Sequence, residues 1–211
     1  MFKKVTHEEI EKTKAFHGHW CPGLAIGIRA AEFVLNELGK ASDEEMVAVV
    51  ETDSCAMDAI QFLTGCTYGK GNLIHKDYGK NAFTFYRRRD GKAIRLVARP
   101  RAFSGGGTLS KSQEQIDLIE TLRKKIQTEG LTEEEQRLWE ENRLERCNQI
   151  MEASFEDLFE VKVPLDPPPK EARIHQSLIC ESCKESVMET RTRRFEGQIL
   201  CIPCFEKLEK R

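Results

Sequence analysis

Four cysteines near the C-terminus form two pairs of equal spacing: Cys180 and Cys183, then Cys201 and Cys204. Two Cys-x2-Cys pairs separated by a short loop are typical of a closed, tetrahedral structural zinc site. The ion would replace the hydrophobic core that so short a segment cannot build. Strand-like residues over Ser186–Phe195 and a turn at Glu196-Gly197 predict a zinc ribbon or treble clef. Two disulfides, or four unrelated thiols, are the alternatives.

Composition points to a soluble globular protein in a reducing compartment. Of the 211 residues, 39% are hydrophobic and 32% charged, and eight are cysteines. The first residues do not resemble a signal peptide, and no apolar run approaches the length of a membrane span. We therefore expect a cytoplasmic protein with metal or thiol chemistry and no membrane partner.

Charge gives little support for nucleic-acid binding. The formal net charge is −2, which supplies no global attraction to phosphates. One basic cluster, Arg191-Thr192-Arg193-Arg194, lies between the cysteine pairs, and such a cluster is more often a solvated strand face than a phosphate clamp. Nucleic acid is thus an alternative partner but not the favoured one.

A proline-rich stretch, Pro164–Lys170, marks the clearest boundary in the chain. Three consecutive prolines make a stiff, extended spacer. We predict a core domain over 1–163, a linker over 164–173 and a four-cysteine finger over 174–211.

The core reads as a mixture of helices and strands, an α+β domain. The expected helices are His7–Phe16, 22–38, Ala56–Thr64, 111–128 and 132–151. The expected strands are Met46–Thr52, Phe83–Arg88 and Ala93–Arg99, the last two joined by an Asp90-Gly91 turn. Residues 65–81, with four glycines, are expected to form a loop.

The last two helices follow three glycines, Gly105–Gly107, and carry many charges and only thin apolar stripes. We expect them to pack on the edge of the sheet or on a second subunit. Cys147 lies on one of these stripes, where a packing role is favoured.

Two histidines and a cysteine occupy alternate positions, His17, His19 and Cys21, just before the predicted 22–38 helix. Alternate side chains of an extended segment face the same way, so the three can converge. Cys21 would be the N-cap of that helix, where free amides favour a thiolate. Thiolate beside imidazole suits either a soft-metal site or an activated nucleophile; satisfaction of local backbone groups is the alternative for the histidines.

Cys55 also falls where a strand turns into a helix. We predict that it shares one pocket with His17, His19 and Cys21, and that His19, Cys21 and Cys55 are the best candidate metal ligands. Both cysteines are expected to be thiolates near neutral pH, and a cation between them would relieve their repulsion. Asp53 and Asp58 could orient the imidazoles.

A Gly-Lys-rich loop follows this helix. Its backbone amides and Lys70 could hold an anion, with Cys66 and Asn72 as further candidates. The spacing differs from that of a Walker A motif. A small loop residue is the equally weighted alternative for Cys66.

Two long stretches resemble the family of the E-subunit of formylmethanofuran dehydrogenase. One is Phe16-His17-Gly18-His19-x-Cys21-Pro22-Gly23; the other runs from Cys55 to Leu73, with Asp77-Tyr78-Gly79-Lys80 after it. Some members carry a C-terminal zinc finger, so the resemblance extends over the whole chain. It implies an α+β core and an intertwined homodimer. It does not imply the redox step, because no iron–sulfur spacing is present in the chain.

Three functions remain open at this point. The first is a metal-binding accessory or regulatory protein with structural zinc in the finger, a second transition metal in the core, and a protein partner for the finger. The second is an enzyme that uses Cys21 or Cys55 as nucleophile and His17 or His19 as base on a small anionic substrate. The third is a finger-led RNA- or DNA-binding or metal-sensing regulator.

Overall fold

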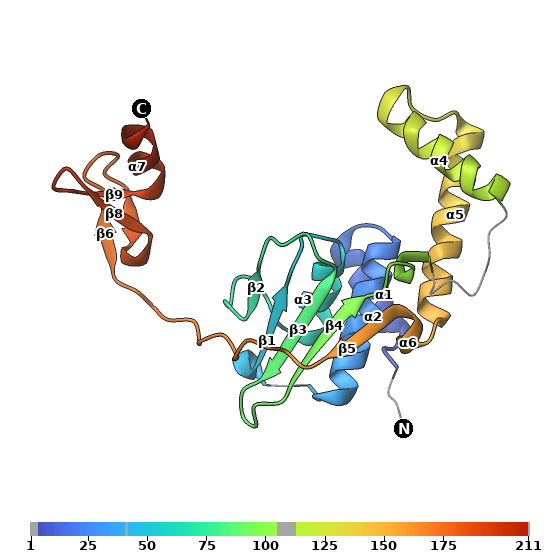
Figure 1. Cartoon of the computed structure of the whole chain (residues 1–211), viewed down its shortest axis with the longest axis horizontal. Helices are drawn as coiled ribbons and strands as arrows, with labels where there is room; N and C mark the ends of the chain where they lie inside the picture. Colours follow the sequence, from blue (N-terminus) through green and yellow to red (C-terminus); the bar gives the residue numbers. More distant parts are fainter. Residues whose placement is uncertain (1–3, 41, 105–112, 211) are drawn as a thin grey trace. The chain divides into compact units, whose positions relative to one another are not determined.

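The computed structural model describes residues 4–40, 42–104 and 113–210 (Figure 1). The chain divides into two compact units, Met1–Glu171 and Ala172–Arg211. Each is described by itself.

The first unit is an α+β domain built on a five-stranded sheet of order β2-β1-β3-β4-β5. The strands are β1 Met46–Val50, β2 Leu73–His75, β3 Ala82–Arg87, β4 Ala93–Ala98 and β5 Phe159–Lys162. β2 runs parallel to β1, and the other neighbours are antiparallel. Every residue of β1 is buried, which explains its unbroken run of valine, alanine and methionine.

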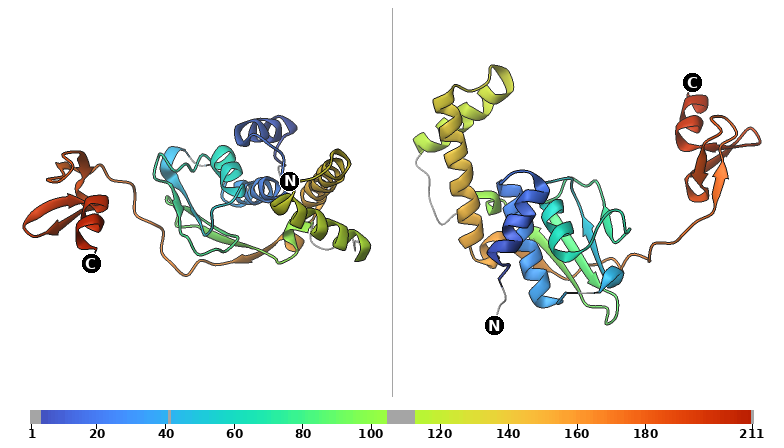
Figure 2. Two further views of the ribbon diagram at one scale, coloured as in Figure 1. Left: turned by 90° about the horizontal axis from the view of Figure 1, so that it is seen from above. Right: turned by 180° about the vertical axis from the view of Figure 1, so that it is seen from behind.

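Two helices, α2 Pro22–Glu37 and α3 Ala56–Thr64, cover one face of this sheet, and α1 His7–His17 packs on their outer side, mainly against α3 (Figure 2). The α2 helix is the most deeply buried and packs its apolar residues, Ala25, Ile26, Ala30 and Val34 among them, against the sheet. Pro22 starts α2 at a position where its missing N–H costs nothing. A capping box between Thr6 and Glu9 starts α1.

The prediction of a loop over 65–81 was wrong at Leu73–His75, which forms β2. Three residues are too few to show an alternating pattern, and the strand exists because the β1 backbone supplies its hydrogen-bond partners, from Ala48↔Leu73 to Val50↔His75. The neighbouring hairpin of β3 and β4 was predicted correctly, with Gly91 in the left-handed conformation that its turn requires.

The charged helices are α4 Gln113–Thr128 and α5 Glu133–Glu152, and they form a hairpin that extends away from the sheet (Figure 1). The C-terminal half of α5 packs on α2 and on the short 3-10 helix η2, Ala102–Ser104, rather than on the sheet edge. Cys147 and Ile150 are buried in that contact. The Gly105–Gly107 hinge lies outside the described residues. A single helical turn, α6 Phe155–Leu158, then leads into β5.

The proline-rich segment is held against the core domain from Asp166 to Pro169. Tyr86 Oη donates to the Asp166 carbonyl at 3.2 Å, and an Arg88 guanidinium nitrogen donates to the Pro169 carbonyl at 2.8 Å. Lys76 lies 3.4 Å from the Asp166 carboxylate. The spacer therefore becomes independent of the core only beyond these contacts.

The second unit is a small finger of two β-hairpins and one helix. Its elements are β6 Ser177–Ile179, β7 Ser186–Met188, η3 Glu189–Arg191, β8 Thr192–Phe195, β9 Gln198–Cys201 and α7 Ile202–Glu209. Glu196 and Gly197 make the turn of the second hairpin, both with positive φ. Its apolar centre consists of little more than Leu200 and the cysteines, with the Phe195 and Phe205 rings packed edge to face.

Within the described residues, no helix combines the length and apolar character needed to cross a bilayer.

Candidate metal centres

The finger brings its four cysteines to one point. The sulfur atoms of Cys180, Cys183, Cys201 and Cys204 all lie within 4.8 Å of one another. Each pair comes from one knuckle: Lys184, at φ 66°, follows the first pair, and the first turn of α7, with Cys201 as its N-cap, contains Cys204 of the second. The Cys201 amide donates to Cys180 Sγ at 3.3 Å and lowers the pKa of that thiol to about 6. Four thiols of this geometry fit one structural zinc ion.

The core cluster starts at the turn between α1 and α2. His17 is the last residue of α1, and Gly18, at φ 92°, reverses the chain in a left-handed conformation that glycine adopts without strain. Cys21 is the N-cap of α2, as predicted, and its Sγ accepts the Leu24 amide at 3.4 Å. The five-residue segment from His17 to Cys21 therefore forms a tight turn that brings the side chains of His17, His19 and Cys21 together.

Cys55 reaches this turn because two glycines allow α3 to approach α2 closely. A Cβ placed on Gly27 would lie 2.4 Å from the Ala56 carbonyl oxygen, and one placed on Gly23 would lie 3.1 Å from Cys55 Cβ. The two glycines are one turn apart on the same face of α2. Together they form the groove in which the first residues of α3 rest.

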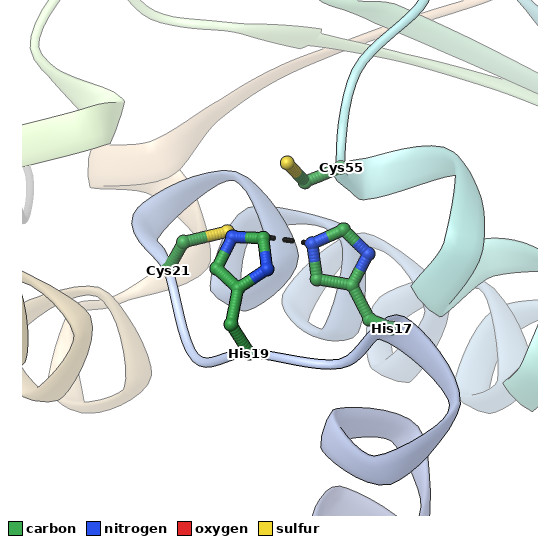
Figure 3. A group of neighbouring side chains, drawn as sticks. All are labelled: His17, His19, Cys21 and Cys55. Atoms are coloured by element: carbon green, nitrogen blue, oxygen red, sulfur yellow. Dashed lines mark hydrogen bonds between the residues drawn. The ribbon is translucent and has the colours of Figure 1, made fainter.

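The nitrogen and sulfur donors of His17, His19, Cys21 and Cys55 lie within 4.8 Å of one another (Figure 3). Cys21 Sγ is 3.8 Å from His17 Nε2, and the two imidazole rings lie tilted by 39° with centroids 4.4 Å apart. Cys21 is only 9% exposed, whereas His19 lies on the surface. The structure thus brings together all four residues named from the sequence, and the cluster opens to solvent at His19.

Asp58, on the first turn of α3, fixes the orientation of His17. Its Oδ2 lies 2.7 Å from His17 Nδ1, so the carboxylate accepts the Nδ1 proton and leaves the Nε2 lone pair directed at the cluster. Such a carboxylate–histidine pair is the usual support of a metal-bound imidazole. Asp53, the other carboxylate considered, is exposed and makes no described contact with either imidazole.

The prediction of a thiolate at Cys55 near neutral pH was wrong for the protein without a cation. Burial, followed by the neighbouring Cys21 thiol, raises the pKa of Cys55 to about 11. Cys55 is the N-cap of α3, but its backbone is helical and its sulfur accepts no capping hydrogen bond. Backbone amides therefore lower the pKa of Cys55 too little to offset the effect of burial.

His19 is disposed to remain neutral. Partial burial of its ring lowers its pKa, and the nearby His17 and Arg143 lower it further. A neutral imidazole offers a lone pair to a metal, so this environment suits a ligand.

The residues proposed for anion binding lie elsewhere. Cys66 is fully buried, donates to the Met46 carbonyl at 3.5 Å, and has its pKa raised by burial. Asn72 is also buried and bridges two backbone groups, the Thr67 amide and the Met46 carbonyl. Lys70 lies 3.6 Å from Asp43. The structure does not bring these three to the cluster, and anion binding at Lys70 stays a prediction.

Sequence reasoning missed the contribution of α5. Cys147 is fully buried, and burial, then the Cys21 thiol, raises its pKa to about 11. Arg143, one turn earlier on α5, acts electrostatically on both His19 and Cys147. The signal available in the sequence was the i, i+4 spacing of these two residues, but nothing there indicated which helix they would face.

Comparison with known proteins adds the family. Residues 16–160 match the model described as FmdE, molybdenum formylmethanofuran dehydrogenase operon, and residues 176–210 match the prokaryotic dksA/traR C4-type zinc finger.

A solved structure, a tungsten formylmethanofuran dehydrogenase FmdE-like protein from Syntrophus aciditrophicus, shares the fold: the TM-score is 0.58 at 24% identity, over 97% of this chain and 94% of that one.

A curated relative from Archaeoglobus fulgidus, named a probable S-adenosyl-L-methionine-binding protein, is 33% identical over 92% of this chain. The chain spans 51% of that relative's length. Since the FmdE model covers more than half of the 211 residues, the chain belongs to the FmdE family, as a member that ends in a C4-type zinc finger.

Proposed function

We propose that this protein is a metal-binding accessory or regulatory protein that holds one transition-metal ion in its core and one zinc ion in its finger. The observation that carries the core site is the convergence of two imidazoles and two thiols within 4.8 Å. These groups come from the end of α1, the α1–α2 turn and the start of α3, so only the folded domain assembles them.

The donor set defines the class of metal. Two sulfurs and two nitrogens suit zinc, and also nickel, copper or iron, and disfavour magnesium and calcium. Cys21 and Cys55 would bind as thiolates and His19 as a neutral imidazole, with His17 as ligand or as a close hydrogen-bonding neighbour. A divalent cation also compensates for the cost of placing two thiolates side by side.

An enzymatic role is the second candidate, and one geometric observation favours it. Cys21, His17 and Asp58 form a thiol–imidazole–carboxylate chain, with 3.8 Å between Cys21 Sγ and His17 Nε2 and 2.7 Å between His17 Nδ1 and Asp58. That arrangement is also found around activated cysteine nucleophiles. The name of the curated relative adds S-adenosyl-L-methionine as a ligand to test.

For the finger we propose contact with a protein partner. Several large apolar side chains are exposed on it, namely Ile179, Met188 and Leu208. Nucleic acid is the second candidate partner, supported by the exposed arginines of β8 and the turn before it, Arg191, Arg193 and Arg194.

Metal analysis of the purified full-length chain separates the candidates. We expect two metal ions per wild-type chain and one ion per chain in the Cys21→Ser or Cys55→Ser variant, in which only the finger keeps its metal. The Cys183→Ser variant makes the same chemical change in the finger and should also hold one ion, in the core. A wild-type content of one ion, unaffected by Cys21→Ser and Cys55→Ser, would exclude the core metal and favour the cysteine nucleophile.

A further inference from the structure

Arg143 has a buried polar atom that is unpaired. Its Nε is removed from solvent and has no hydrogen-bond partner within the part of the chain that the structure describes. Buried nitrogen donors in proteins are nearly always satisfied, by protein groups, by ordered water or by a bound ligand. Arg143 is thus a candidate ligand-binding residue.

The position of Arg143 on α5 places it beside the core cluster. It lies four residues before Cys147, on the same face of the helix, and Cys147 is fully buried where α5 packs on α2. Arg143 is close enough to His19 to contribute to lowering the pKa of that residue. The packing of α5 on α2, with Met151 against the apolar cluster that contains Cys21, thus brings this helix and its cation near the core site.

The neighbouring cations are already engaged. Lys14 lies 2.6 Å from the Glu11 carboxylate and also rests over the Trp20 ring. Arg146 donates to the Phe103 carbonyl through two nitrogens, at 3.1 and 2.9 Å. Arg143, by contrast, has a buried Nε with no partner among the described residues.

We propose that the core site takes a small oxyanion, a carboxylate or a phosphate, held by the Arg143 guanidinium with one oxygen directed at the metal. This proposal rests on the metal-binding function proposed above. A guanidinium pairs with such groups through two parallel hydrogen bonds. A zinc-like ion can accept a fifth ligand, or exchange an exposed one, and His19 is the exposed member of the set.

The experiment uses full-length protein loaded with cobalt(II), whose visible absorption bands report changes in coordination. The Cys21→Ser variant, which keeps the finger, supplies the finger's own spectrum for subtraction. Acetate and inorganic phosphate are titrated separately at constant ionic strength, and the two titrations distinguish a carboxylate from a phosphate ligand. The variants are Arg143→Gln, Arg143→Lys, and Arg137→Gln, which makes the same change at an exposed position of α5.

With at least one anion we expect a saturable shift of the core cobalt bands. The affinity for that anion should fall about tenfold or more in Arg143→Gln, less in Arg143→Lys and not in Arg137→Gln. No shift with either anion, or an equal shift in Arg143→Gln, would overturn the proposal while leaving the metal site intact. Loss of core cobalt in Arg143→Gln would also overturn it, by showing a structural role. Absence of core cobalt from the wild type would instead refute the underlying metal-binding function.

Discussion

Gly27 of α2 lies directly against Ala56, the first residue of α3, with no room for a methyl group between them. A Cβ at Gly27 would stand 2.4 Å from the Ala56 carbonyl oxygen and 2.6 Å from its Cα. Because these contacts are with backbone, a side-chain rotation cannot relieve them. The distance between the two helices, and with it the position of Cys55, depends on this glycine.

We therefore predict that Gly27→Ala separates α3 from α2, destabilises the fold by about 1–3 kcal/mol, and removes Cys55 from the core site. Thermal unfolding and metal content of the full-length chain measure the two effects. Gly69→Ala is the matched control, since a Cβ there would meet nothing within 4 Å. If Gly27→Ala leaves both stability and core metal unchanged, the close helix crossing does not position Cys55.

Asp58 should matter through His17 rather than by binding metal itself. We predict that Asp58→Asn lowers the affinity of the core site for its metal by about 10- to 100-fold, because a neutral amide accepts the Nδ1 proton of His17 less strongly than a carboxylate does. Competition with a chelator of known affinity measures the change. Asp53→Asn, at the exposed neighbouring carboxylate, should have no effect. Equal affinities for wild type and Asp58→Asn would contradict the orienting role.

Much of the fold and most of the cluster were open to prediction from the sequence. His17, His19 and Cys21 are neighbours in the chain, and both Pro22 and the apolar period of α2 mark where the helix begins. Their meeting with Cys55 was inferred because both cysteines precede helices. Local signals of this kind need no knowledge of tertiary packing.

Three features depended on contacts that the sequence does not display. The pKa of Cys55 follows from its burial and from the Cys21 thiol that tertiary packing places beside it. β2 exists through its pairing with β1. The placement of Arg143 requires α5 to pack on α2, and the thin apolar stripe of α5 did not identify that partner.

The raised pKa of Cys55 gives metal binding a pH dependence. A ligand thiol must lose its proton, so affinity for the core metal should rise by about tenfold per pH unit for each proton released, from neutral pH up to about 11. A chelator titration at several pH values tests this. Cys55→Ser provides the reference. If the metal affinity of the core site in this variant rises with pH as steeply as in the wild type, the proton is released by another group.

The same shift affects the stability of metal-free protein in the opposite sense. The folded-state pKa of Cys55 lies above the ordinary thiol value of 9.0, so protonated Cys55 favours folding. That contribution is complete below pH 9 and is lost as the pH rises through about 11. Denaturant unfolding of chelator-treated protein should show a loss of stability over this interval that is smaller in Cys55→Ser, in which Cys147, whose pKa is also raised to about 11, still titrates.

The finger should depend on its zinc ion, because its apolar centre is too small to fold alone. We predict that Cys183→Ser unfolds the finger and leaves the thermal transition of the core unchanged. Hydrogen exchange measured over 172–210 and over the core domain separates the two responses. The prediction is falsified if the core transition shifts together with the finger.

Quaternary structure remains a proposal, and the α4–α5 hairpin is where we expect it to be decided. The hairpin exposes several large apolar side chains: Ile116, Leu118, Ile126, Leu138 and Leu144. A cavity of about 340 Å³ lies between its two helices, lined by Leu118, Leu122 and Leu138 among others. An exposed apolar surface of this kind is typical of an interface, and the resemblance to the family implies a homodimer.

We predict a dimer mass by light scattering at micromolar concentration, and a monomer after Leu118→Glu combined with Leu138→Lys. The opposite charges keep the pair compatible within one hairpin while removing its apolar surface. Exposed Lys124→Glu combined with Glu134→Lys, on the same two helices, is the control and should remain dimeric. A monomeric wild type would end the proposal, and a dimeric double variant would move the interface away from the hairpin.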